Sequence, residues 1–230
     1  MTEPFAARHT LPRHHGLAVA VITSVVAVVS SLIALEGRVP GWEAEGLRFF
    51  NRWPDWLEPG LWVLQQFGVV VAPLLAGLVV ARHTRNWWYL LPFALILPLK
   101  LGIEKAVVKQ LVDRQRPFVS VGPEIDVRGS AFEGPSFPSG HTTTAFAMAV
   151  LLCVFLPRRW WPLPLTWAAL VGVSRLYHGE HNVLDVVAGA AIGTGLATIV
   201  WLVVVNRLIK RESESARPVT TGLEQSTLTP

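Results

Sequence analysis

Long apolar blocks alternate with short polar connections along most of this chain. Six blocks approach the length of a bilayer crossing, and they cover residues 16–35, 61–81, 87–108, 141–156, 161–176 and 184–208. A helix needs about 20 apolar residues to cross the hydrocarbon core, so the fourth and fifth blocks are short and need help from neighbouring helices or local thinning. The pattern predicts an all-α, polytopic membrane protein that is a bundle of six transmembrane helices.

The apolar blocks divide the chain into three parts. Residues 1–15 form a polar N-terminal tail, residues 16–208 form the membrane domain, and residues 209–230 form a Ser-, Thr- and Glu-rich tail that we expect to be disordered. The first block could instead be a cleaved signal peptide. We favour a retained anchor, because the block is long and Glu36-Gly37-Arg38 makes a poor cleavage site.

Composition supports this class and excludes others. The 230 residues are 51% hydrophobic and only 16% charged, whereas soluble domains have about 25% charged residues. The net charge of +4 is modest and much of it flanks the apolar blocks, so nucleic acid is not an expected partner. The single Cys153 allows no disulfide framework and no zinc site.

Basic residues indicate the orientation of the bundle. The connections on one side carry Arg and Lys with few acids, whereas the other side mixes basic residues with many Asp and Glu. The predominantly basic side is expected to be cytoplasmic. The protein is then expected in the plasma membrane with both termini in the cytoplasm. The connections 36–60, 109–140 and 174–184 face outward. The Trp-rich stretch 36–60 is either an interfacial aromatic belt or an entry surface for a lipid.

Charged residues also interrupt the third apolar block. Lys100, Glu104 and Lys105 are costly against lipid, so we expect them to face the bundle or lie near its end. Lys100 and Glu104 are four residues apart, which suits an ion pair on one helix face.

A first polar cluster closes the third block. If the helix continues, Lys109 and Arg116 lie seven residues apart on one face, before Pro117 turns the chain away. Two cations aimed at one point suit a dianionic phosphate. The alternative is a set of snorkelling side chains at a helix end. An ion pair or a solvated edge would explain Arg114 and Asp113.

A second polar cluster, Pro138-Ser139-Gly140-His141, opens the fourth block. Ser139 is a candidate helix cap, and Gly140 lets the backbone approach a ligand closely. His141 stands at a helix N-terminus, where free N–H groups and the helix dipole favour an anion.

A third polar cluster, residues 174–185, links the fifth and sixth blocks. His181 and Asp185 are four residues apart, so on a helix the carboxylate can fix the imidazole tautomer and leave the other nitrogen nucleophilic. Arg175 would be a third cation for the phosphate. The pair could also be a structural hydrogen bond or half of a metal site. All three clusters map to the same outer side.

Together the three clusters resemble the signature of the type-2 phosphatidic acid phosphatases, integral-membrane lipid phosphatases related to the vanadium haloperoxidases. The matching parts are Lys109…Arg116-Pro117, Pro138–His141 and Ser174-Arg175…His181…Asp185. The resemblance covers roughly residues 60–205, with the signature at 109–185. One departure is Asn182-Val183, where relatives often have an aromatic residue and proline; we expect it to alter loop shape only.

The resemblance implies an enzyme that hydrolyses lipid phosphates without a metal or other cofactor. It assigns His181 as the nucleophile that forms a phosphohistidine, Asp185 as its orienting partner and His141 as the general acid. The phosphate would be held by Lys109, Arg116, Ser139, Gly140 and Arg175. The implied substrate comes from the outer leaflet: phosphatidic acid, phosphatidylglycerol phosphate or a polyprenyl diphosphate such as the undecaprenyl carrier.

Several questions stay open from the sequence. A transporter or binding protein for anionic lipids would need the cations, but not His141, His181 and Asp185 together. The residues leave the oligomeric state and the roles of His178, Glu180 and Arg114 unassigned. Small residues recur at i,i+4 steps on the fourth and sixth helices, and we expect the face of His141, Ala145 and Ala149 to meet the face of Asp185, Gly189 and Gly193.

Overall fold

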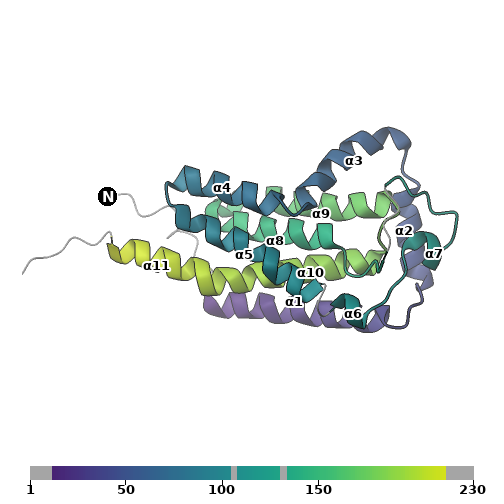
Figure 1. Ribbon diagram of the computed structural model, residues 1–230, viewed down its shortest axis with the longest axis horizontal. Coiled ribbons are helices and arrows are strands. Elements are labelled where there is room, and N and C mark those ends of the chain that lie inside the picture. Colours follow the sequence, from purple (N-terminus) through teal and green to yellow (C-terminus); the bar gives the residue numbers. More distant parts are fainter. Residues whose placement is uncertain (1–11, 105–107, 130–133, 216–230) are drawn as a thin grey trace, which may run out of the picture.

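A computed structural model describes residues 12–104, 108–129 and 134–215, apart from the Lys109 side chain. Within these ranges the chain is helical and contains no strand, as the apolar pattern predicts. The longest helices among the described residues run along one axis (Figure 1). They are α1 (Arg13–Ala34), α4 (Ala72–Thr84), α5 (Leu90–Ile103), α8 (Gly140–Phe155), α9 (Pro162–Tyr177) and α10 (Val183–Val200).

In the part of the chain that the structure describes, two helices are long and apolar enough to cross a membrane by themselves, α1 and the continuous helix Val183–Ser215. The latter is α10 extended through the π-helical turn η7 (Trp201–Val205) into α11 (Asn206–Ser215). It runs past the expected domain boundary at residue 208, so the first part of the tail expected to be disordered is helical. Residues 1–11 and 216–230 of the two expected tails lie outside the described residues.

The stretch expected to form one crossing, residues 61–81, is not one continuous helix but belongs to two helices that meet at a bend. α3 (Glu58–Gln65) and the short η3 (Gln66–Gly68) meet α4 at an angle of 70°. Val69 is extended at the break, and Pro73 lies in the first turn of α4, where proline favours a new helix start. A third crossing is reached only if this bent pair counts as one span; α5 with the preceding turn η4 (Trp87–Tyr89) and α8 are shorter apolar helices.

α8 lies inside the bundle and packs against α10 through glycine. A Cβ on Gly189 would lie 2.6 Å from the carbonyl oxygen of Ser139, and one on Gly193 would lie 2.3 Å from that of Thr143. The expected close approach of α10 is therefore confirmed, but the expected partner face of α8 is wrong. Ala145 and Ala149 instead pack against α9, because α9 covers the other side of α8.

Short helices cover the end of the bundle at which α9 ends and α8 and α10 begin (Figure 1). These are α2 (Gly41–Asn51), η2 (Asp55–Leu57), α6 (Lys109–Leu111) and α7 (Pro117–Ser120). Much of the Trp-rich stretch 36–60 is therefore helical. Phe49 of α2 is exposed, whereas Glu43 and Leu47 are buried. α2 therefore packs over the polar helix ends with one face.

The opposite end of the bundle carries a second polar contact. The Tyr89 hydroxyl donates a hydrogen bond of 2.6 Å to Glu212 on α11. η6 (Arg158–Trp160) lies in the connection between α8 and α9, with both arginines at its start. The polar groups thus gather at the two ends of the helices and leave the middle apolar.

Candidate active site

The polar residues predicted from the sequence converge at the end of the bundle covered by α2. The N-terminus of α8 and the first turn of α10 are joined there by a hydrogen bond of 2.9 Å from the Ser139 N–H to the Asp185 carbonyl. The last turn of α9 brings Arg175 to the same place. Three helix ends therefore combine the second and third clusters into one site.

His181 and Asp185 form the expected pair. Their Nδ1 and Oδ2 atoms are 3.5 Å apart, the long limit for a hydrogen bond, and both side chains are buried. The helix that was expected to align them begins only after His181, with Asn182 as its cap. Asp185 Oδ2 accepts the Asn182 N–H at 2.8 Å in a capping box, so the helix start itself fixes the carboxylate.

Burial determines the protonation of His181. Loss of solvation lowers the pKa of its imidazole to about 4; the Asp185 carboxylate opposes this shift, while Arg175 and Arg116 add to it. The imidazole is therefore neutral at physiological pH. With Nδ1 facing Asp185, Nε2 is the atom left for chemistry.

Arg175 lies within a cavity of polar character. Its buried guanidinium donates to Gln65 at the end of α3 and to the carboxylate of Glu180. The cavity measures about 340 Å³ and is lined by Glu58, Trp62, Gln65, Gln66, Arg128, Gly129, His141, Arg175 and Glu180. A phosphate that binds in the cavity would either share Arg175 with Glu180 or displace the Glu180 carboxylate from Arg175. The structure thus locates Glu180 at the cavity, whereas the sequence left its role open.

Gly140 approaches an ion pair closely, whereas the sequence analysis expected its backbone to approach a ligand. A Cβ at Gly140 would lie 2.9 Å from Glu104 Oε1 and 3.1 Å from Lys100 Nζ. Lys100 and Glu104 are 3.3 Å apart and buried, which confirms their expected pairing inside the bundle. Lys100 thus adds a cation beside the α8 N-terminus that the signature does not contain; Lys105 lies outside the described residues.

Ser139 occupies the N-cap position of α8 but makes no side-chain cap, which corrects the capping expectation. Its hydroxyl instead accepts a hydrogen bond of 3.0 Å from Thr142. His141 follows on the first turn of α8 and lines the polar cavity together with Arg175. The second cluster therefore faces the third across this cavity.

The arrangement of the first cluster differs from the prediction. A helix from Lys109 through Arg116 is wrong, because α6 ends at Leu111 and Val112 is extended. Pro117 also holds Arg116 in an extended conformation. Arg116 still reaches the site, where it donates a hydrogen bond of 2.8 Å to the Glu180 carbonyl. The side chain of Lys109 lies outside the described part of the structure.

Arg114 forms an ion pair, which was one of the two explanations offered from the sequence, but its partners were not predicted. Arg114 is fully buried and bridges Asp185 to Glu43, which belongs to α2. Burial alone would lower the pKa of Arg114, but the two carboxylates hold it above its ordinary value. Arg114 and Glu43 are 71 residues apart, and no spacing in the sequence links them. The sequence therefore contains no sign that they are partners.

His178 has a structural role in this arrangement. It is fully buried at the end of α9, and its Nδ1 lies 2.6 Å from the Ser174 carbonyl, one turn earlier.

Among the described residues, no group of three or more His, Cys, Asp or Glu side chains is placed to hold a metal ion.

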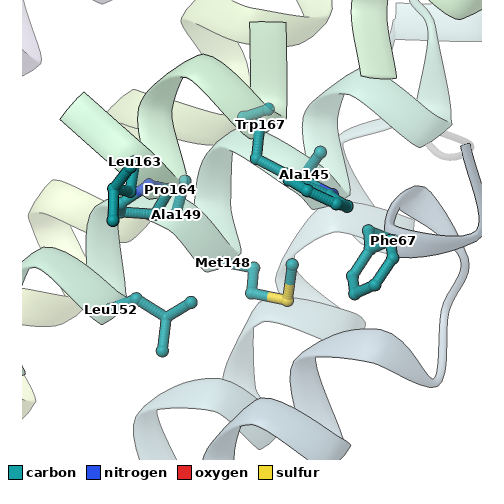
Figure 2. Close-up of a pocket in the computed structure, with 9 residues that line it drawn as sticks. Phe67, Ala145, Met148, Ala149, Leu152, Leu163, Pro164 and Trp167 are labelled. Carbon is teal, nitrogen blue, oxygen red and sulfur yellow. The ribbon is translucent and has the colours of Figure 1, made fainter. Parts of the chain in front are cut away.

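Two apolar cavities lie next to the polar one. The first measures about 290 Å³ between α8, α9 and η3, where Phe67 and Trp167 face Met148 (Figure 2). The second measures about 520 Å³ between α4 and α8 and shares Phe67, Met148 and Leu152 with the first. Gln66 lines both the second apolar cavity and the polar cavity. The three spaces are therefore neighbours around the bend at η3.

These features define a class: a helical membrane protein whose helix ends assemble guanidinium groups, an anion-favouring helix N-terminus and a buried His–Asp pair. The chain belongs to the PAP2 superfamily, whose family model matches residues 87–209. This confirms the resemblance drawn from the three clusters.

Individual relatives agree with this membership. An undecaprenyl-diphosphatase from Sulfolobus acidocaldarius is 34% identical over 126 residues, which are 54% of this chain and 59% of the relative. A lipid A 4'-phosphatase from Bacteroides thetaiotaomicron is 30% identical over 135 residues, 54% of this chain and 60% of the relative. The matches thus span about 60% of these two relatives. The crystal structure of Aquifex aeolicus LpxE superposes with a TM-score of 0.60 at 26% identity, covering 71% of this chain and 96% of that one.

Proposed function

We propose that this protein is a lipid phosphatase that transfers the phosphoryl group of a lipid phosphate or diphosphate to His181 and then to water. One observation carries the proposal: His141, Arg175 and Glu180 line a polar cavity, and the buried His181–Asp185 pair begins at the residue after Glu180. Membership of the PAP2 superfamily and the names of its relatives as phosphatases support it.

Each residue has a task in the reaction. His181 Nε2 attacks phosphorus in line while the bond from phosphorus to the leaving oxygen breaks, which forms a phosphohistidine. His141 donates a proton to the leaving oxygen and then accepts one from the water that hydrolyses the intermediate. Asp185 stabilises the positive charge that His181 acquires.

Fixed donors hold the phosphate during both steps. The proposed set comprises Lys109, Arg116, Ser139, the Gly140 N–H and Arg175. Arg175 and His141 of the first α8 turn line the same cavity, which supports a phosphate bound beside them, with Arg175 exchanging part of its contact with Glu180 for the phosphate. These donors are cationic or dipolar, and the scheme uses no metal or cofactor.

The neighbouring apolar cavities suit the hydrocarbon part of the substrate. Chains that lie beside Phe67 and Met148 would leave the phosphate at the level of His141, because Ala145 and Met148 follow His141 on α8. The S. acidocaldarius relative is named for an undecaprenyl diphosphate and the B. thetaiotaomicron relative for lipid A. A polyprenyl diphosphate, phosphatidic acid and phosphatidylglycerol phosphate are therefore the substrates to test.

The topology completes the proposal. Six crossings result if the bent pair α3–α4, α5, α8 and α9 each cross the membrane in addition to α1 and Val183–Ser215. Both termini then lie in the cytoplasm and the site opens outward, as the distribution of basic residues supports. The exposed apolar side chains of α1, such as Val21, Ile22 and Val25, are consistent with contact to lipid.

Phosphate release by purified protein tests the function. Lipid phosphates and diphosphates are assayed in detergent with EDTA, using wild-type protein, His181→Ala and His15→Ala as a control at an exposed histidine of α1. We expect turnover in EDTA, its loss by more than about 1,000-fold in His181→Ala, and no change in the control. Equal release by His181→Ala would contradict the mechanism. Binding of the lipids by wild-type protein without release would instead support a transporter or binding protein.

A further inference from the structure

We propose that Glu43 and Arg114 are positioning residues for the nucleophile, because together they hold Asp185 in the orientation that serves His181. The proposal rests on the proposed function. It gives the outer helix α2, which contributes no group to the phosphate cavity, a defined part in the chemistry.

The contacts form one continuous chain behind the nucleophile. Arg114 Nη1 donates to Asp185 Oδ1 at 3.1 Å and to Glu43 Oε1 at 2.9 Å, and Nη2 donates to Glu43 Oε2 at 2.5 Å. All three side chains are fully buried. The guanidinium therefore has two carboxylates in fixed directions, and solvent does not compete for any of them.

The two oxygens of Asp185 have separate partners. Oδ1 accepts from Arg114, while Oδ2 accepts the Asn182 N–H at 2.8 Å and faces His181 Nδ1. Rotation of the carboxylate would break both hydrogen bonds together. Arg114 thus prevents Asp185 from turning away from a histidine that is 3.5 Å distant and cannot hold the carboxylate by itself.

Glu43 fixes Arg114 in turn and connects it to α10. Its Oε1 also accepts the Leu184 N–H at 2.8 Å, in the first turn of the helix that carries Asp185. Both ends of the chain of contacts therefore lie on α10. Glu43 does not line the phosphate cavity, so its effect on the reaction must reach Asp185 through Arg114 or through the first turn of α10.

Charge gives a second reason for a functional role. Two carboxylates and one guanidinium leave one net negative charge in a buried place, and His181 becomes positive as the phosphohistidine forms. Buried ion clusters are weak devices for stability, since apolar replacements are often as good or better. A cluster at the back of the nucleophile is better explained by what it does for Asp185.

The test compares two isosteric changes on contacts of α2. Glu43→Gln removes the charge behind Arg114, whereas Glu124→Gln breaks the exposed 2.6 Å ion pair of α2 residue Arg48 with the neighbouring loop. We expect Glu43→Gln to lower kcat by about 10–100-fold while KM and inhibition by inorganic phosphate stay within about threefold, because ground-state binding is untouched. Glu124→Gln should behave as wild type. A wild-type kcat in Glu43→Gln overturns the proposal.

Arg114→Lys provides an independent variant, because it keeps the charge and loses the two-carboxylate geometry. We expect a similar fall in kcat for Arg114→Lys. In the double variant Glu43→Gln/Arg114→Lys, the fold loss of kcat should be smaller than the product of the two single losses, because Glu43 and Arg114 act on the same carboxylate. Independent, multiplicative losses would contradict this. The melting temperature of each variant is measured beside its activity. If neither variant folds, or if the folded protein turns over normally, the cluster serves only stability and the proposal fails. Absence of His181-dependent release in wild-type protein would instead refute the proposed function.

Discussion

The side chain of Asp185 contacts both the start of α10 and His181, the proposed nucleophile. As the third residue of α10 it completes the capping box with Asn182, and the same oxygen faces His181. A capping carboxylate is tied to the backbone, so its position is more precise than that of a side chain on a free surface. The stabilisation of the helix and the orientation of His181 therefore depend on the same atoms.

The buried state of His181 has a measurable pH dependence. Attack needs the neutral imidazole, and burial lowers the pKa of His181 to about 4. We therefore expect the acidic limb of the kcat/KM profile near pH 4. The ionisation of the substrate is titrated separately, and the profile is corrected for it. The unfolded chain takes up this proton near pH 6.5, so the folded state loses stability as the pH falls from about 6.5 through about 4.

Rates and melting temperatures from about pH 3 to about pH 8 check this prediction, because the limb and the loss of stability both extend through pH 4. A corrected acidic limb near pH 6.5 would show that the nucleophile is solvated. His181→Ala provides the control for stability, because it removes this titration and leaves the other groups in place.

Single residues show where sequence reasoning succeeds and where it ends. Arg175, His181 and Asp185 could be predicted because short spacings near helix ends place them together. Glu43 could not, because it is one of many acids in the outer connections, and its burial depends on α2 folding across the bundle. Local spacing carries no information on a contact that joins such distant segments.

Among the helices, the pairing of α8 with α10 sets the geometry of the site. The glycine face of α10 was predicted from its i,i+4 steps, and its backbone does approach Ser139 and Thr143. The matching face of α8 was mispredicted, because alanines at equal spacing lie against α9 and polar threonines face the glycines. Small size alone does not tell which neighbour a helix face meets.

Gly189→Leu tests this pairing. A side chain at this position would start 2.6 Å from the Ser139 carbonyl, so the α8 N-terminus must move away from Asp185. We expect a loss of kcat of at least about 100-fold and a lower melting temperature, because overpacking at a close helix contact shifts backbone. Gly102→Leu on α5, where nothing lies within 4 Å, is the control and should retain activity. Normal turnover in folded Gly189→Leu would refute this role for the contact.

Helix ends are a second place where the sequence misleads. The apolar run 61–81 is continuous in hydrophobicity, yet the chain bends by 70° after Gly68. The run toward Arg116 likewise ends early at Leu111. Both breaks occur within a few residues of a proline, and hydropathy averages across such breaks instead of detecting them.

The assembled protein places polar and apolar cavities side by side around one bend. Met148→Trp tests whether the apolar ones hold the lipid chains, because Met148 lines both of them and none of the polar cavity. We expect KM for a long-chain lipid phosphate to rise by about 10-fold or more, while a short-chain, water-soluble phosphate keeps its kcat/KM. Equal losses on both substrates would indicate a disturbed fold and contradict this location.

The bend itself touches three parts of the site through neighbouring residues. Gln65 accepts a hydrogen bond from Arg175, Gln66 lines two cavities, and Gly68 packs so closely that a Cβ there would lie 2.8 Å from the His141 Cβ. A mutation that opens the bend for a bulkier lipid would therefore also move His141 and Arg175, the proposed acid and a proposed phosphate ligand. Lipid preference and turnover then depend on the same few residues of the bend, so we expect a change in lipid preference there to require compensating changes in α8 and α9.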